Sequence, residues 1–409
     1  MPGKKYIAEL GDWQGFRVGS VGRYGAGLPG PREEIWVELY PDKDFPMTCS
    51  GCGEIVTRVH EHVERWVRDL PAWGADTRLL VHLRRVKCAQ CGTRMEKVPW
   101  LDTYARVTKR LAESIARLCD ILPIRQAAEF YGVAWHTAKR VHKNYLVETL
   151  GAADLSNLTV IAMDEFAIQK GHRYATVIVE PQTRRVLWVG RGRRREDIRP
   201  FFELLGKEGC QRIEAAVMDM WEAFEQEVKA HCKRAEIVYD LFHVVGNYGR
   251  EVMDRVRVDE AKRLEEDKAA RKVIKGSKWL LLRNKENIRR PKDRVRLKEL
   301  LSANRRLSTA YILKDDLKHL WEYRYEGAAR RFWEQWYNRA IRSRIEPLKK
   351  FARKLKERLP GILSHCRHPF NTSILEGMNN KIKVIKRMAY GFRDDEYFFL
   401  RIRHAFPGI

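Results

Sequence analysis

The period of hydrophobic and polar positions changes several times along the chain. Between residues 49 and 100 the runs RVHEHVERWV and RLLVHLRRV alternate apolar and polar side chains, which predicts short strands, and EIWVELYP predicts one more strand before them. From 101 to 150 the period becomes helical. Further along, apolar runs surround a helical stretch, REDIRPFFELLG, and predict an α/β segment with strands at 158–163, 174–180, 185–190, 213–220 and 235–242.

The last third of the chain is predicted to be helical. From about 250 to 365 there is almost no strand signal, only long charged patterns rich in Arg, Lys and Trp, and a final apolar–basic helix is expected at about 372–388. An aromatic side chain in this segment could stack on an unpaired base, but packing in a helical core is the alternative that the periodicity favours.

The charge balance indicates that the protein has a polyanionic partner. Lys and Arg number 79 against 54 Asp and Glu, a net charge of +25. Neutralising phosphates releases counterions, so this excess favours nucleic acid. No run approaches the roughly 18 apolar residues of a membrane span, and the N-terminus lacks the apolar region of a signal peptide. A bacterial cytoplasmic location without a membrane partner is therefore expected.

Four of the eight cysteines form two C-x-x-C pairs, each followed by glycine: Cys49, Cys52, Cys88 and Cys91. Such pairs can give four thiolates to one tetrahedral Zn²⁺, and the glycines let backbone amides turn toward the sulfurs. The pairs lie further apart than the roughly 15–20 residues of the usual ribbon, so a hairpin insertion is expected between them. Four thiolates leave no open position, which predicts structural zinc. Two redox or fortuitous pairs are the alternative.

Residues 123–142 have the pattern of a helix-turn-helix. Pro123 suits the start of a helix, and Gly132 suits a tight left-handed turn before the second helix. An ordinary pair of helices with a solvated basic face is the alternative. The candidate DNA contacts are Arg125 of the first helix and His136, Lys139, Arg140 and Lys143 of the second.

Acidic residues close several of the predicted strands. Asp164 follows the run LTVIAM, and Asp219 follows IEAAVM; acids at the carboxyl ends of neighbouring strands can share a crevice. Asp240 and His243 are predicted to close another strand. Taken singly, each acid has the alternative of a solvated cap or an ion-pair partner.

A glutamate far downstream is a further candidate. Glu376 lies in a helical stretch with Asn380 and Lys383 at i+4 and i+7, so these three share one helix face. Carboxylates suit Mg²⁺, which prefers hard oxygen ligands, and two such ions about 3.5–4 Å apart can promote phosphodiester cleavage.

The segments MDEFAIQKGHRY, VMDMWEAF, YDLFHVVGNYG and SILEGMNNKIKVIKRMAYGF resemble those of DDE transposases of the ISL-three insertion-sequence family. The resemblance implies an α/β ribonuclease H-like catalytic core with a mixed sheet and a large all-helical insertion, preceded by a zinc-binding module and a helix-turn-helix. It implies that Asp164, Asp219 and Glu376 hold Mg²⁺ or Mn²⁺. Asp240 and His243 resemble an element that follows the second aspartate in related transposases, and Lys383 is expected to contact a phosphate.

The same resemblance implies five segments: a zinc-binding domain (1–100), a helix-turn-helix domain (101–150), the first part of the core (151–250), the helical insertion (251–365) and the last part of the core with its glutamate (366–409). The implied enzyme is a nucleoid-associated homodimer that binds terminal inverted repeats in double-stranded DNA. It cuts the element ends and joins the 3′-OH to target DNA. Two rivals remain: a DNA-binding regulator with an inactive core, and a ribonuclease H-like nuclease that cuts without joining.

Overall fold

The computed structural model describes residues 2–25, 33–169, 171, 173–283, 285–370 and 373–408. The chain divides into two compact units, Met1–Gly151 and Ala152–Ile409, and each is treated separately below. Within the described residues, no helix is both long and apolar enough to cross a membrane.

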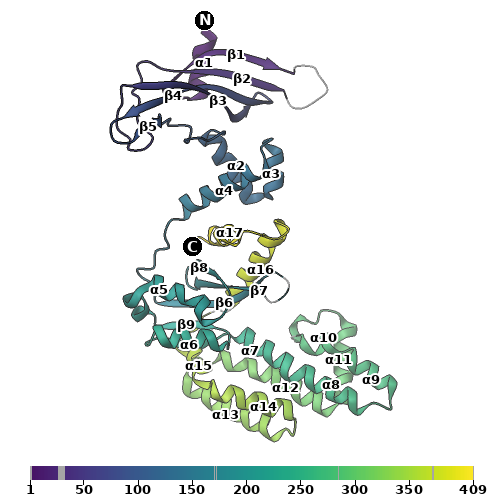
Figure 1. Cartoon of the computed structure of the whole chain (residues 1–409). Coiled ribbons are helices and arrows are strands. Elements are labelled where there is room, and N and C mark those ends of the chain that lie inside the picture. Colours follow the sequence, from purple (N-terminus) through teal and green to yellow (C-terminus); the bar gives the residue numbers. More distant parts are fainter. Residues whose placement is uncertain are drawn as a thin grey trace. The chain divides into compact units, whose positions relative to one another are not determined.

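The first unit begins with a five-stranded sheet in the order β1-β2-β4-β3, with β5 paired to β4 (Figure 1). The strand run EIWVELYP forms β2, and the two alternating runs form β3 and β4. These last two are not short as predicted; each has 14 residues, because they pair with each other as one long antiparallel hairpin. The elements are α1 (Pro2–Gly11), β1 (Phe16–Tyr24), β2 (Glu34–Pro41), β3 (Val59–Ala72), β4 (Ala75–Cys88) and β5 (Gly92–Met95).

Strand β1 was not predicted, because two glycines interrupt its apolar–polar alternation. Gly19 and Gly22 lie beneath the rings of Tyr40 and Trp36 of the paired strand β2. A Cβ atom at either glycine would approach the ring to 2.5 or 2.3 Å, so a side chain at either position would require the ring to move.

Three helices complete this unit: α2 (Lys109–Ile121), α3 (Ile124–Phe130) and α4 (Trp135–Leu150). The predicted pair corresponds to α3 and α4, with Pro123 at the N-cap of α3 and Gly132 at a φ of +59° between the helices. Helix α2 supplies the apolar surface on which the pair packs. The buried His142 of α4 lies 3.0 Å from Asp120 of α2 and links these two helices.

The second unit contains a mixed sheet in the order β10-β9-β6-β7-β8. All five predicted strands are present; β10, β9 and β6 are parallel, and β6, β7 and β8 are antiparallel. The bounds are β6 (Val160–Gln169), β7 (Arg173–Glu180), β8 (Arg185–Arg191), β9 (Ala215–Met218) and β10 (Glu236–Tyr239).

Helices cover both faces of this sheet (Figure 1). The predicted helix between the third and fourth strands is α5 (Arg195–Arg212), and with α6 (Glu222–His231) it packs on one face. The other face carries α16 (Ser373–Met388) and α17 (Asp395–Ala405). The C-terminal helices therefore return to the sheet after the long helical segment.

The helical segment has its own hydrophobic core. Trp333 and Trp336 are buried there with their ring centroids 5.3 Å apart, so these two tryptophans serve packing rather than base stacking. The elements are α7 (Leu241–Tyr248), a π-helical turn η1 (Gly249–Met253), α8 (Asp254–Arg263), α9 (Lys268–Lys275), α10 (Lys278–Leu282), α11 (Pro291–Ala303), α12 (Arg305–His319), α13 (Glu326–Arg342), α14 (Glu346–Glu357) and α15 (Leu359–Leu363).

Candidate functional site

Three aspartates stand side by side on the parallel part of the second sheet. Met218 of β9 is the register partner of Met163 in β6 and of Tyr239 in β10. The residue after each of these is an aspartate, and strand alternation directs all three toward the face covered by α16 and α17. They are Asp164, Asp219 and Asp240.

Two predictions about the strand ends are wrong. Asp164 does not end its strand: β6 continues to Gln169, because its other edge pairs with the long strand β7. Its parallel neighbour β9 does stop at Met218, so Asp164 still lies where the parallel ladder ends. Asp240 and His243 do not close a strand either. Asp240 is the N-cap of α7 and accepts a hydrogen bond of 2.7 Å from the Phe242 amide, which places His243 in the first turn of that helix.

The His243 ring lies among the three carboxylates. Its Nδ1 is 3.3 Å from Asp219 Oδ2, and its Nε2 is 3.8 Å from Asp164 Oδ1 and 3.7 Å from Asp240 Oδ2. Burial opposes a positive charge, but the hydrogen bond with Asp219 and the charges of the three carboxylates raise the pKa of His243 to about 9.

The first two aspartates differ in their electrostatic surroundings. Asp164 is buried, and this desolvation raises its pKa to about 6 although His243 acts in the opposite direction. Burial also acts to raise the pKa of Asp219. The hydrogen bond and the charge of His243 outweigh this effect and lower the pKa of Asp219 below its ordinary value. A cation at this place would therefore favour the charged form of Asp164 as well.

The aspartates line a cavity of about 340 Å³ that also receives side chains from α16. Glu376, Asn380 and Lys383 line it from one helix face, with Glu376 exposed to solvent. The structure thus brings together every acid predicted for the catalytic site. The full lining is Asp164, Glu165, Asp219, Asp240, Phe242, His243, Arg250, Glu376, Asn379, Asn380 and Lys383.

Sequence reasoning missed two residues of this cavity that carry useful chemistry. Asn379 donates a hydrogen bond of 2.5 Å from Nδ2 to Asp164 Oδ2, while its buried Oδ1 has no hydrogen-bond partner among the described residues. Its position at i+3 from Glu376 was a signal that could have found it. Arg250 lies in the π-helical turn η1, and no spacing rule indicates that such a turn directs it to the cavity.

Glu165 also lines the cavity, but it belongs to a different contact group. Its Oε1 lies 3.1 Å from Nη1 of Arg193, whose guanidinium is 4.1 Å from the Tyr174 ring centroid and 4.3 Å from that of Trp221. Burial raises the pKa of Glu165, and its Oε2 has no hydrogen-bond partner within the described ranges. Glu165 differs from the three aspartates because its carboxylate forms an ion pair with Arg193.

Three other acids close in sequence to the predicted site residues have structural contacts outside the cavity: Glu222, Asp394 and Asp395. Glu222 accepts a hydrogen bond of 2.7 Å from Gln226 in α6. Asp394 caps α17 by accepting from the Tyr397 amide, and Asp395 accepts from Arg191 at 2.5 Å. None of these three lines the cavity of the aspartates.

The donor set of the cavity fits a hard cation. Its acids offer carboxylate oxygens, and the amide oxygen of Asn379, which has no partner among the described residues, is a further hard oxygen that can ligate a cation or accept a hydrogen bond. The carboxylates are not drawn tightly together, however. Of the described residues, only the four predicted cysteines bring three or more ligand atoms within 4.8 Å of one another.

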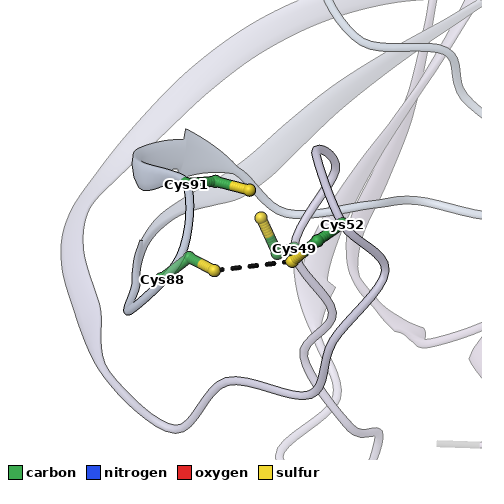
Figure 2. A group of neighbouring side chains, drawn as sticks. All are labelled: Cys49, Cys52, Cys88 and Cys91. Carbon is green, nitrogen blue, oxygen red and sulfur yellow. Dashed lines mark hydrogen bonds between the residues drawn. The ribbon is translucent and has the colours of Figure 1, made fainter.

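These cysteines meet at the end of the first sheet (Figure 2). Cys52 Sγ lies 3.5 Å from Cys88 Sγ, and all four sulfurs lie within 4.8 Å of one another. Tetrahedral zinc with Zn–S bonds of about 2.3 Å places sulfurs about 3.8 Å apart, so the cluster fits this ion. The β3–β4 hairpin is the insertion predicted between the pairs.

Backbone amides donate hydrogen bonds to the sulfurs of the first cysteine pair. The Gly51 amide donates to Cys49 Sγ at 3.4 Å, and backbone hydrogen bonds from Cys52 and Gly51 lower the pKa of Cys49 to about 7. Gly53 and Gly92 adopt φ values of +79° and +71°, which favour glycine after each pair. Together with the sulfur geometry, these features support a structural zinc site.

The predicted DNA contacts lie on the helix-turn-helix. Arg125, His136 and Arg140 are exposed, while Lys139 and Lys143 are half-buried. Arg125 forms an ion pair with Glu129 on α3, and Lys139 lies 5.7 Å from the Trp135 ring centroid on α4. The start of α4 therefore presents basic and aromatic groups.

Comparisons with known proteins agree with this organisation. The ISL3 family model described as "Transposase" matches residues 161–402, the helix-turn-helix domain of transposase family ISL3 matches 96–146, and a zinc-finger of transposases IS204, IS1001, IS1096 and IS1165 matches 46–91. The chain is 50% identical over 406 residues to the transposase for insertion sequence element IS1001 of Bordetella parapertussis, covering 99% of this chain and 98% of that protein.

A more distant relative shows the same function class. The transposase for insertion sequence element IS1557 of Mycobacterium tuberculosis is 26% identical over 349 residues, covering 79% of this chain and 78% of the relative. The family match extends over more than half of the chain, and the IS1001 match extends over almost all of it. The chain therefore belongs to the ISL3 family of insertion-sequence transposases, with a zinc ribbon, a DNA-binding helix-turn-helix and a transposase domain.

Proposed function

We propose that this transposase cuts the ends of its element and joins them to target DNA at the cavity of the three aspartates. The observation that carries the proposal is the equal register of Asp164 in β6 and Asp219 directly after the parallel strand β9, with Glu376 of α16 lining the same cavity. A mixed sheet covered by helices on both faces supports a ribonuclease H-like core.

In this proposal Asp164, Asp219 and Glu376 hold Mg²⁺ or Mn²⁺. Bound divalent ions would supply positive charge to the attacking and leaving oxygens. Asn379 fixes the second oxygen of Asp164, and His243 orients the carboxylate of Asp219 by its contact of 3.3 Å. Asp240 supports His243 from the start of α7.

Two further side chains offer positive charge to the scissile phosphate. Lys383 and Arg250 line the cavity and are exposed, so both can reach a phosphate that enters it. The cavity thus combines a cation-binding side with cationic side chains for the substrate.

The proposed reaction has two steps. In the first, water attacks a phosphorus at the element end; a new P–O bond forms, the P–O3′ bond breaks, and the leaving oxygen takes up a proton to give a 3′-OH. In the second, that hydroxyl loses its proton and attacks a target phosphorus, and the target's own 3′ oxygen leaves. No covalent bond to the protein is needed.

The helix-turn-helix is proposed to bind the terminal inverted repeats through Arg125, His136, Lys139, Arg140 and Lys143. Cys49, Cys52, Cys88 and Cys91 are proposed to hold zinc as a structural ion. A homodimer is proposed because two element ends must be processed together.

The test is cleavage and joining of an element-end duplex with Mg²⁺. The parent is expected to cut and join, whereas Asp219→Asn and Glu376→Gln should bind the duplex but lose both steps. Glu222→Gln is the matched control, because this nearby acid lies outside the cavity. Undiminished cutting by Asp219→Asn would overturn the site. Binding without cutting by the parent would favour a regulator, and cutting without joining would favour a nuclease.

A further inference from the structure

Positive charge is concentrated in one part of the helical segment. Residues 268–298 contain thirteen Lys and Arg against two Glu and Asp, a net charge of +11 in a chain whose total is +25. This part, called the basic lobe below, consists of α9, α10 and the beginning of α11 with their connections. Nearly half of the protein's net charge therefore lies in a small fraction of its length.

Most of these cations face solvent without an acidic partner. Four of the thirteen have partners: Arg271 with Glu265, Lys278 with Asp254, Arg283 with Asp293, and Arg294 with the Ile288 carbonyl. The other nine are exposed and have no carboxylate within 4.0 Å in the described part of the chain: Lys268, Lys272, Lys275, Lys285, Arg289, Arg290, Lys292, Arg296 and Lys298.

The lobe is a packed structure with a defined outer side. Ile274, Leu281, Ile288 and Leu297 are buried in the core of the helical segment, which fixes α9, α10 and α11 by their apolar sides. At Gly276 a Cβ atom would lie 3.3 Å from the guanidinium of Arg296, so the end of α9 and the middle of α11 are adjacent. Helices α9, α10 and α11 lie together in the helical segment (Figure 1), so the cations that they carry belong to one packed unit.

Such a surface stores repulsion between like charges, which a polyanion would relieve. Phosphates fit these nine cations because neutralising them releases the counterions condensed on DNA. Lys and Arg can contact base edges as well as phosphates, but a docked helix or strand reads bases with only about three or four side chains, whereas nine exposed cations are spread over α9, α11 and the residues between them. We therefore expect most of their contacts to be with the phosphate backbone, which carries little sequence selection.

We propose that the basic lobe binds the phosphate backbone of target duplex DNA. This inference rests on the proposed function, because a strand-joining enzyme has to hold a second duplex beside the element end. The helix-turn-helix lies in the other structural unit and supplies the contacts proposed for sequence recognition. The lobe would give the catalytic unit its own means of capturing DNA.

The experiment uses the full chain and fluorescence anisotropy with two labelled duplexes of equal length, one of unrelated sequence and one carrying the element end. Binding is measured without divalent ions over a range of salt concentrations, so that it does not depend on catalysis. The lobe variant combines Lys272→Gln, Lys275→Gln, Arg289→Gln and Arg290→Gln. The matched control removes four exposed cations elsewhere in the same unit: Lys207→Gln, Lys233→Gln, Arg234→Gln and Arg331→Gln.

The lobe variant should bind the unrelated duplex about 10- to 100-fold more weakly near 0.1 M salt. The slope of log affinity against log salt concentration should fall by an amount that corresponds to about two to four phosphate contacts. The control variant should stay within about threefold of the parent, and all proteins should bind the element end within about threefold of one another. Strand joining by the lobe variant should fall while cleavage of a bound element end persists.

Three results would overturn the proposal. The lobe variant could keep the parent's affinity and salt dependence, or the control could lose as much affinity as the lobe variant, which would show a general effect of net charge. Equal losses on both duplexes would assign the lobe to the element end rather than to the target. Because no cutting is measured in the binding arm, a failure of the proposed catalytic function would be seen separately.

Discussion

Asn379 donates a hydrogen bond of 2.5 Å to Asp164 across 215 residues of sequence. The bond joins α16 to β6, and thus joins the helix of Glu376 to the strand of the first aspartate. It occupies Oδ2 of Asp164, while Oδ1 accepts a hydrogen bond of 2.8 Å from the Glu165 amide and lies 3.8 Å from Nε2 of His243. We infer that Asn379 is a positioning residue for the proposed cation site.

Replacing Asn379 with alanine is expected to lower the rate of element-end cleavage by about 10- to 100-fold, or ~1.4–2.7 kcal/mol in activation free energy. The carboxylate of Asp164 would lose its fixed orientation while the fold persists. Initial cleavage rates and thermal unfolding check this result. Asn338→Ala, an exposed amide on α13, is the matched control. Equal rates for the parent and Asn379→Ala would refute the positioning role.

The zinc site should be needed for the stability of the first unit. Its ligands join the loop after β2 to the β4–β5 turn, so Cys88→Ser should remove bound zinc and lower the thermal midpoint of this unit by about 10 °C, as expected for a loss of about 3 kcal/mol. Zinc content by mass spectrometry and calorimetry measure the two effects. Cys366→Ser, outside the cluster, should retain one zinc ion per chain. A zinc-free parent of unchanged stability would count against the site.

Arg140 is expected to contribute to binding of the element end. It is exposed on α4, and Arg140→Ala should weaken binding about tenfold, or ~1.4 kcal/mol, and reduce the salt dependence by about one phosphate contact. Anisotropy titrations measure both quantities. Arg117→Ala on α2 removes an exposed arginine that pairs with Glu113 at 2.6 Å, and should change little. Identical losses for the two variants would show that α4 has no special role.

Lys314 gives a pH-dependent contribution to the stability of the helical segment. Its buried ammonium donates to the Leu281 and Arg283 carbonyls, each at 3.0 Å, and burial lowers the pKa of Lys314 to about 8 from an ordinary 10.5. The folded state therefore releases its proton first as pH rises. Between about pH 8 and 10.5 the unfolded state binds more protons, so the contribution of Lys314 to stability increases with pH over this window.

The comparison is between the parent and Lys314→Met at pH 7.5 and pH 9.5. Hydrogen exchange of α12 measures the free energy of unfolding of this helix. Between pH 7.5 and pH 9.5 this free energy should rise in the parent by on the order of 2 kcal/mol more than in the variant. A difference that is constant with pH, or that shrinks as pH rises, would show that the lysine titrates normally in the folded chain.

Much of the fold was predictable because its signals are local. The five strands of the second sheet, the helix α5 and the helical segment follow from the period of apolar residues within each stretch. The length of β6 could not be predicted, because its antiparallel pairing with β7 extends the strand five residues beyond Asp164. Strand β1 was missed because its two glycines break the apolar–polar alternation, and only the pairing with β2 shows that aromatic rings pack over them.

The sequence by itself determined the chemistry: the paired cysteines, the excess of cations and the acids after apolar runs are visible as residue types at fixed spacing. Only the tertiary structure decided which groups meet. It set the equal register of the three aspartates, placed His243 between them, directed Arg250 into the cavity and bonded Asn379 to Asp164. The physical reason is that short-range spacing fixes a residue's face on its own helix or strand, whereas strand register and helix docking arise from packing between segments that are distant in sequence, up to 215 residues apart for Asn379 and Asp164.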